Sequence, residues 1–205
     1  MFEVFQRNFP RDRQDRRGHD VEGLRPDIPG LREFFAAFGG SSFRDGLYRV
    51  IAPADLNEWN ERICLGFPEF EGRITCFGFD WLGSTFAIDA GRIEDGQKGV
   101  VMFEPGTGEA LEIPANLFTF HDAGLLEFGE AALAISFYER WRTSGGATPA
   151  FDQCIGYKKP LFLGGSDGVE NLELSDLDVY WHLMGQFITK AKGLPPRTPI
   201  SVSLS

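Results

Sequence analysis

The sequence of 205 residues has no apolar run that approaches the ~20 residues a membrane-spanning helix needs. Its N-terminus carries charges but no following apolar stretch, so no secretory signal is predicted. Only three cysteines occur, Cys64, Cys76 and Cys154, and no Cys-x-x-Cys is present, so neither a disulfide framework nor a zinc knuckle is indicated. We expect the cysteines to be small buried hydrophobic residues of a cytoplasmic protein.

Histidine is also scarce, and none of the three histidines has a second one at the i+4 spacing of a helical metal site. His121 and Asp122 could serve as a base and its orienting acid, but no serine stands in a Gly-x-Ser-x-Gly turn. We therefore predict a partly buried structural role for His121. Nuclease, protease, kinase and Rossmann motifs are missing too, so no enzyme is indicated. A hydrolase whose carboxylate pair no motif reveals stays open as an alternative.

Two glycine-rich stretches lack the lysine of a phosphate-binding loop. Residues 104–109 (EPGTGE) have an acid at each end and are predicted to form a hairpin turn. The stretch 163–168 (LGGSDG) opens an acidic region in which Asp167, Glu170, Asp176 and Asp178 could gather round a calcium ion, but the spacing of an EF-hand is absent. We expect a solvated acidic loop here, and neither a metal nor a cofactor.

Basic residues are outnumbered by acids, 20 to 30, which gives a net charge of −10. The first 17 residues hold five arginines against three acids, whereas residues 44–139 hold 17 acids against six basic residues. Residues 160–189 contain five acids and no lysine or arginine. Such a body repels nucleic-acid backbones and anionic membranes and attracts a basic partner, although surplus acids also serve solubility alone.

Phenylalanine is unusually abundant at 20 residues, and because such rings are costly to leave in water, a packed core is predicted. The polar and charged stretch 10–27 is the exception. We predict that residues 1–28 form a loose N-terminal arm. Residues 29–205 are predicted to form a single domain, with a candidate internal boundary in the loop at 143–150.

Apolar spacing and turn residues predict two early helices, at 29–38 and from Pro53 to Cys64. Short strands are predicted at 47–51, 73–79, 85–89, 100–103 and 109–113. They follow one another at hairpin spacings, with a loop at 90–97 and Pro114 as the end of the last strand. Residues 116–143 are predicted to be mostly helical. The fold class is therefore α+β, a mostly antiparallel meander with flanking helices.

The C-terminal part of the sequence has its own pattern. Short strands are predicted within 154–165 and at 171–174. Ser175 and Asp178 stand three apart, as in a helix N-terminal cap with an acid that reaches back, and apolar residues then recur at helical spacing as far as Ala191. Residues 200–204 (ISVSL) are predicted to add an edge strand.

Asp80 and Trp81 lie in a predicted turn between two strands, where a large ring is less easily buried. A tryptophan is most often a core or near-core residue, but it is also enriched at the hot spots of protein interfaces. Both interpretations of Trp81, core packing and partner contact, stay open at this point.

Three segments, 77–83 (FGFDWLG), 86–89 (FAID) and 103–108 (FEPGTG), resemble the central sheet of the SUKH superfamily, the Smi/Knr-like immunity proteins. The helix that closes on Gly39-Gly40 fits the same pattern. Further along, the segments that resemble the C-terminal domain of type VI secretion immunity proteins are 156–165 (GYKKPLFLGG), 170–172, 179–181 and 185–186. The resemblance covers roughly residues 29–192, and its motifs are packing and turn motifs rather than catalytic ones.

The resemblance implies a SUKH-like α+β fold and a cytoplasmic, non-enzymatic antidote that binds and neutralises a bacterial toxin. We hypothesise that an acidic surface complements a basic toxin, for which a nuclease is one candidate, and that the chain binds neither nucleic acid nor membranes directly. The residues expected to contact the partner are Asp80, Trp81, Glu104, Glu112, Asp167 and Glu170. We expect a monomer or a weak homodimer. The alternative is a regulatory or scaffold module of the same fold.

Overall fold

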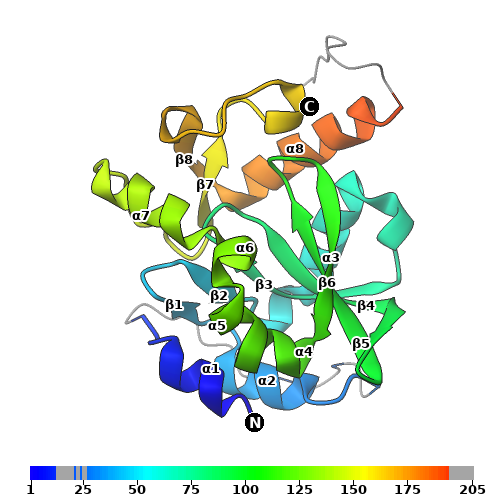
Figure 1. The fold of residues 1–205 in the computed structure, drawn as a ribbon. Helices are drawn as coiled ribbons and strands as arrows, with labels where there is room; N and C mark the ends of the chain where they lie inside the picture. The colour runs from blue at the N-terminus through cyan, green and yellow to red at the C-terminus, as the bar shows by residue number, and fades with distance from the viewer. Residues whose placement is uncertain (13–20, 22–23, 25–26, 194–205) are drawn as a thin grey trace.

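The computed structural model describes residues 1–12, 21, 24 and 27–193, and it has an α+β fold (Figure 1). Its centre is a six-stranded antiparallel sheet in which each strand pairs with its neighbours in the sequence. The predicted fold class, a meander with flanking helices, is confirmed. The strands are β1 (Ser42–Phe43), β2 (Tyr48–Val50), β3 (Ile74–Asp80), β4 (Thr85–Glu94), β5 (Gln97–Glu104) and β6 (Glu109–Asn116).

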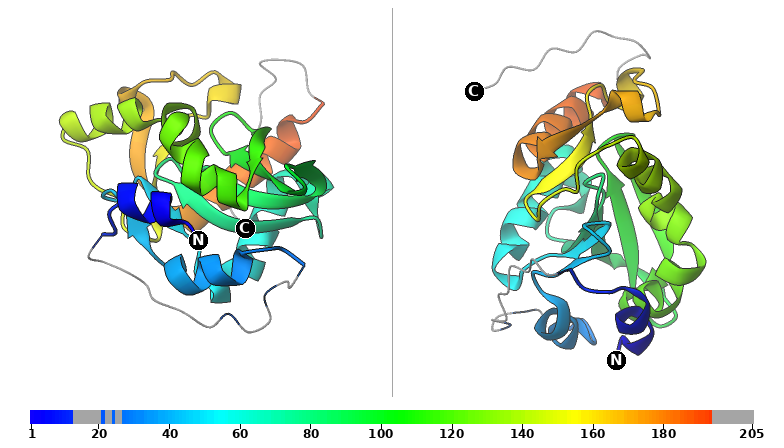
Figure 2. Two further views of the ribbon diagram at one scale, coloured as in Figure 1. Left: turned by 60° about the horizontal axis from the view of Figure 1, so that its bottom comes forward. Right: turned by 90° about the vertical axis from the view of Figure 1, so that its left-hand side faces the viewer.

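Helices lie on both sides of this sheet (Figure 2). One layer holds α1 (Glu3–Asn8), α4 (Leu117–Thr119), the π-helical turn η3 (Phe120–Gly124), α5 (Leu125–Glu127), α6 (Gly129–Leu133) and α7 (Ile135–Thr143). The helix α2 (Leu31–Phe38) covers an end of the sheet, where Phe34 packs against Phe2 and Phe77. The other layer holds η1 (Pro53–Asp55), α3 (Leu56–Gly66), η2 (Pro68–Phe70) and α8 (Leu177–Ala191).

A bulge in β3 lets one strand pack aromatic rings into both layers. The register of β3 against β4 shifts between Cys76 and Gly78, so the residue between them is an extra one on its strand. Phe77 consequently packs its ring against Phe120 of the first layer. Phe79, two residues on, stacks on Trp59 of α3 in the second layer at a centroid distance of 4.5 Å.

The C-terminal part forms a small antiparallel pair of strands next to α8. It comprises β7 (Gln153–Tyr157), η4 (Leu161–Leu163), η5 (Val169–Asn171), β8 (Leu172–Asp176) and α8. The N–H of Ile155 in β7 donates to the carbonyl of Trp81 at 2.8 Å. The indole Nε1 of Trp181 donates to the carbonyl of Gly83 at 2.8 Å. This part is therefore hydrogen-bonded to the turn that follows β3.

Arg49 joins the same two parts from inside the protein. Its guanidinium is buried and lies over the ring of Phe79, 4.5 Å from the ring centroid. It donates hydrogen bonds to the carbonyls of Ala150, Gln153 and Asp80. Burial lowers the pKa of Arg49 to about 10, so the group stays charged at neutral pH. The loop at 143–150 is thus fastened to the sheet at its C-terminal end, and its role as a domain boundary stays a prediction.

The first 12 residues are packed against the body, so the predicted loose arm is wrong for them. Phe2, Phe5 and Phe9 are buried, and the N–H of Phe5 donates to Asp122 Oδ1 at 3.0 Å. Three phenylalanines spaced three or four residues apart form the apolar face of a helix. They were grouped with the charged stretch that follows, and the helix was therefore not predicted. Residues 13–20, 22–23 and 25–26 of the predicted arm lie outside the described residues.

The sheet is longer than predicted at two places. Residues 90–97 are not a loop, because β4 and β5 continue to a tight turn at Asp95-Gly96, where both residues have positive φ. Pro114 does not end β6. Gly99 pairs with Asn116 while Val100 pairs with Ile113, so the proline sits in a bulge of an edge strand, where it breaks no ladder.

The helices predicted at 29–38, from Pro53 to Cys64 and up to Ala191 are confirmed as α2, η1 with α3, and α8. The start of α8 differs in one detail. Its N-cap is Asp176, whose Oδ1 accepts a hydrogen bond from the N–H of Val179 at 3.0 Å, while Ser175 belongs to β8. The predicted edge strand at 200–204 lies outside the described residues.

Candidate partner-binding surface

Trp81 lies inside the protein. It is fully buried, and its indole Nε1 donates a hydrogen bond to the carbonyl of Leu133 at 2.9 Å. Its ring packs against Phe137 and Tyr138. The interpretation of Trp81 as a partner contact is therefore wrong. The covering residues come from α6 and α7, some 50 positions later in the sequence, so local spacing could not reveal the burial.

Asp80 is buried as well and holds the turn after β3. Its Oδ1 accepts hydrogen bonds from the N–H groups of Leu82 at 2.9 Å and Ser84 at 2.8 Å. Burial raises the pKa of Asp80 to about 8, because these hydrogen bonds only partly offset the loss of water around the carboxylate. The prediction that Asp80 contacts a partner is wrong for the same reason as for Trp81.

Glu104 and Asp167 are brought together across the turn at 104–108. Burial raises the pKa of Glu104, and the carboxylates of Glu109 and Asp167 raise it further, against a hydrogen bond from the Thr107 hydroxyl at 2.9 Å. Glu104 therefore lies within electrostatic range of Glu109, its cross-strand partner, and of Asp167. Glu109 and Asp167 are exposed and Glu104 is half-buried. We call Glu104, Glu109 and Asp167 the acidic junction.

The acidic junction is held by contacts between the turn and the C-terminal part. The N–H of Leu161 donates to the carbonyl of Gly106 at 2.9 Å, and the hydroxyl of Tyr157 donates to Asp167 Oδ1 at 2.7 Å. The Tyr157 ring lies so close to Gly106 that a Cβ there would come within 2.7 Å of it, which explains the glycine. Hydrogen bonds thus hold the carboxylates of Glu104 and Asp167 in place, while Glu109 pairs with Glu104 through the backbone of the sheet.

Glu170 lies on η5, in the segment that carries Asp167, and is exposed. Its Oε1 accepts a hydrogen bond from the Ser166 hydroxyl at 2.8 Å, and its backbone carbonyl accepts one from Lys158 Nζ at 2.9 Å. A hydrogen bond from its own backbone N–H and the one from Ser166 lower the pKa of Glu170, so it is fully ionised at neutral pH. It therefore adds negative charge to this side of the molecule.

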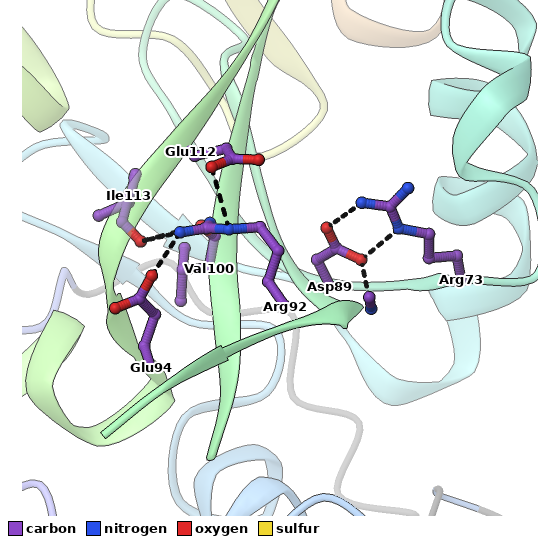
Figure 3. A network of polar contacts seen from close by, with 8 residues as sticks. Arg73, Asp89, Arg92, Glu94, Val100, Glu112 and Ile113 are labelled. Atoms are coloured by element: carbon purple, nitrogen blue, oxygen red, sulfur yellow. Dashed lines mark hydrogen bonds and ion pairs between the residues drawn. The ribbon is translucent and has the colours of Figure 1, made fainter. Parts of the chain in front are cut away.

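Glu112 belongs to a different group of charges, on the sheet (Figure 3). Its Oε2 lies 3.3 Å from Arg92 Nε, and Arg92 also pairs with Glu94 at 2.5 Å. Arg92 reaches across β5 to the carbonyl of Ile113 on β6 as well. The charge of Glu112 is thus partly compensated, unlike the charges of the acidic junction.

Next to it, Arg73 and Asp89 form a bidentate ion pair, with both N···O distances at 2.6 Å (Figure 3). Burial alone would raise the pKa of Asp89, but the hydrogen bonds from Arg73 and from the N–H of Gly91 outweigh it and lower the pKa. The contrast with Asp80, which is also buried, shows what a paired arginine does to a carboxylate. This pair stabilises the sheet rather than forming a binding site.

Most of the basic side chains in the acidic body are engaged internally. Of the six between Arg44 and Glu139, Arg49 is buried and four form ion pairs with carboxylates: Arg62, Arg73, Arg92 and Lys98. The sixth, Arg44, lies over the ring of Phe9. Each of these ion pairs also engages a carboxylate, so the predicted acidic surface stays a prediction.

His121 is a structural residue, as predicted, although it is fully buried. Its Nδ1 lies 2.8 Å from the carbonyl of Leu117, which can only accept, so Nδ1 carries the proton and Nε2 accepts from the Tyr48 hydroxyl at 2.9 Å. Burial lowers the pKa of His121 to about 3, so the ring is neutral at physiological pH. The described residues contain no group of three His, Cys, Asp or Glu side chains placed to hold a metal ion.

Residues 126–188 match the family model of the T6SS immunity protein Tdi1, C-terminal. This segment begins in α5, ends in α8 and contains Asp167 of the acidic junction. The fold is similar to that in the crystal structure of Atu4351 from Agrobacterium tumefaciens, with a TM-score of 0.59 and 17% sequence identity over 91% of this chain and 89% of that one. A search of curated proteins finds no match.

The matched segment begins at a feature that sequence reasoning missed. Phe128, between α5 and α6, is 64% exposed, and Leu126 is 42% exposed. Phe128 stands between Glu127 and Gly129, outside the apolar positions used to predict the helix. The neighbours of Phe128 in the sequence, Glu127, Gly129 and Glu130, are the only local indication that its ring lies outside a buried helix face.

No helix in the described parts of the chain is long and apolar enough to cross a membrane.

Proposed function

We propose that this chain is an immunity protein that binds a toxin delivered by a type VI secretion system and blocks it without catalysing a reaction. The observation that carries this proposal is the match of residues 126–188 to the C-terminal domain of a type VI secretion immunity protein. The acidic junction supports it, because neighbouring carboxylates, two of them held by hydrogen bonds, suit the capture of a basic protein surface.

The toxin is basic, and a nuclease is the class that fits best. Enzymes that act on nucleic acids present cationic sites to the phosphate backbone. The acidic junction, with Glu170 beside it, occupies such a site as a nucleic acid would, while Glu112 contributes a weaker, partly compensated charge. The chain itself binds neither nucleic acid nor membranes, and it needs no cofactor.

The wider assignment is to the SUKH superfamily. The chain acts in the cytoplasm as a monomer or a weak homodimer, and it forms a single SUKH-like domain with an internal boundary near 143–150. Residues 1–12 belong to this domain, because Phe2, Phe5 and Phe9 are part of its core.

Growth rescue tests the proposal. The gene next to that of this chain is expected to encode a secreted toxin, and its induced expression is expected to stop growth of a bacterial host. Co-expression of this chain is expected to restore growth, and the two purified proteins are expected to form a complex. A toxin that remains lethal beside the soluble chain contradicts the proposal, and capture of host regulatory proteins instead favours a scaffold module.

A further inference from the structure

Exposed apolar side chains occur on two neighbouring segments, residues 1–8 and the passage from α5 into α6. Nine large hydrophobic side chains are exposed among the described residues, and four of them come from these two segments: Met1, Val4, Leu126 and Phe128. α1 contacts α5, and the two helices lie side by side in both figures of the fold (Figures 1 and 2). We call these four residues the apolar corner. A concentration of this kind is typical of a binding surface rather than of a solvated one.

The backbone of Phe128 is held in place while its ring is exposed. Its N–H donates to the carbonyl of Gly124 at 2.8 Å, and its carbonyl accepts from the N–H of Ala132 at 2.9 Å. Gly129 is buried so tightly that a Cβ there would lie 2.9 Å from Ile135 Cδ1. The backbone on both sides of Phe128 is therefore fixed. A backbone that is already placed loses little conformational entropy on binding, which suits an interface anchor.

The neighbouring helix α1 is equally well supported. Phe2 and Phe5 are buried beneath it, and Phe2 stacks on Phe118 of α4 at a centroid distance of 5.1 Å. The hydrogen bond from Phe5 to Asp122 ties its first turn to η3. Since both helices are packed from below, Val4 and Met1 stay on the outside without any structural need for their apolar groups.

The charges around the apolar corner indicate what covers it. Glu127 and Glu130 flank Phe128, and Glu3 is exposed on α1, so these three acids outnumber the two exposed cations, Arg7 and the N-terminal ammonium of Met1. A second copy of this chain packed corner to corner would bring the same glutamates face to face, which is unfavourable. A partner with an apolar centre and a basic rim suits both features.

We propose that the apolar corner is the surface that retains the toxin, with Phe128 as its anchor. This inference rests on the proposed function, because the occupant is the basic toxin of that proposal. It assigns a role different from that of the acidic junction: the acids attract the toxin, and the corner holds it by excluding water from apolar surface.

The test compares two exposed apolar residues on opposite layers of the molecule. Phe128→Ala is expected to weaken the affinity for the purified toxin encoded beside this chain by at least about 30-fold, as for a hot-spot residue. Leu65→Ala on α3, where the side chain is 51% exposed, is the matched control and is expected to change affinity less than about threefold. Urea unfolding of both variants verifies that neither has lost its fold.

The outcomes separate the inference from the function. If the wild-type chain and Phe128→Ala bind the toxin equally well, the apolar corner does not retain the toxin, and the proposed immunity function is unaffected. A wild-type chain that does not bind the toxin overturns the function, and the inference with it. If wild type is a dimer in sedimentation, and Phe128→Ala is a monomer with unchanged toxin affinity, the occupant is a second copy and the inference is wrong.

Discussion

The acidic junction and the apolar corner differ in how they act on a partner. The junction consists of carboxylates around the turn at 104–108, and the corner consists of apolar side chains on α1 and α5–α6. Charge acts over about 8 Å at physiological ionic strength, so we expect the junction to influence a toxin before contact. Apolar burial acts only after contact. The difference leads us to propose separate surfaces for the rate of encounter and for the lifetime of the complex.

The largest expected effect is on the free energy of unfolding, and it tests whether the Phe128 side chain contributes to the stability of the fold. Trp81→Ala is expected to lower the free energy of unfolding by about 3–5 kcal/mol, because it empties a buried site and leaves the Leu133 carbonyl without its donor. Phe128→Ala is expected to change it by less than about 0.5 kcal/mol. Urea denaturation followed by tryptophan fluorescence or circular dichroism measures both. A large loss of unfolding free energy in Phe128→Ala would mean that the ring is part of the core. Phe128 could then not serve as the binding residue that is compared with the acidic junction.

The next effect concerns the rate of encounter. Neutralising the junction with Glu104→Gln, Glu109→Gln and Asp167→Asn is expected to slow association with the toxin about tenfold at low salt, with little change in dissociation. The matched control neutralises three exposed acids elsewhere, Glu33, Glu61 and Glu71. Stopped-flow mixing gives both rates. If association slows equally in the junction variant and in the control variant, the effect comes from the net charge of the protein and not from the junction.

A smaller effect is expected from pH, through the raised pKa of Glu104. As pH falls from neutral, Glu104 takes up a proton before an unperturbed glutamate does, so the junction loses one charge and association slows by about two- to threefold. The contribution of Glu104 to folding stability changes with pH in the opposite direction to its contribution to the association rate. A raised folded-state pKa means that stability from this group is present at low pH and is lost as pH rises through that pKa.

Association rates measured between pH 7 and pH 4.5 check this prediction, with Glu104→Gln as the control that is expected to flatten the profile. The lifetime of the complex, which depends on the apolar corner, is expected to follow the same profile in both proteins. A profile that Glu104→Gln leaves unchanged assigns the titration to another group.

The smallest effect is expected at Glu112. Because Arg92 compensates its charge and it lies with the sheet network rather than at the junction, Glu112→Gln is expected to change toxin binding by less than about 0.5 kcal/mol. Isothermal titration of Glu112→Gln beside Glu104→Gln makes the comparison. A larger loss at Glu112 moves the contact surface toward β6.

The sheet could be predicted from the sequence because its signals are local. Turn residues at 104–108 and alternating apolar residues define hairpins whatever the rest of the chain does. Asp167 and Glu104 could be named as acids, but their meeting depends on the hydrogen bond from Leu161 to Gly106, which no local pattern encodes.

Other features depend on contacts between distant segments and escaped prediction for that reason. Trp81 is buried by α6 and α7, and Arg49 is a buried cation that joins the sheet to the loop before β7. α1 is hidden at the sequence level by the arginines that follow its phenylalanines. The exposure of Phe128 is known only once the helices on either side of it are placed.

The salt dependence of the two rate constants tests the division between the surfaces most directly. Association and dissociation of wild type, the junction variant and Phe128→Ala are measured with the toxin from about 20 mM to about 500 mM salt. We predict a steep fall of the wild-type association rate with salt, a flat one for the junction variant, and for Phe128→Ala the wild-type slope with much faster dissociation. A wild-type association rate that barely changes with salt, or a Phe128→Ala complex that lives as long as the wild type, contradicts the account.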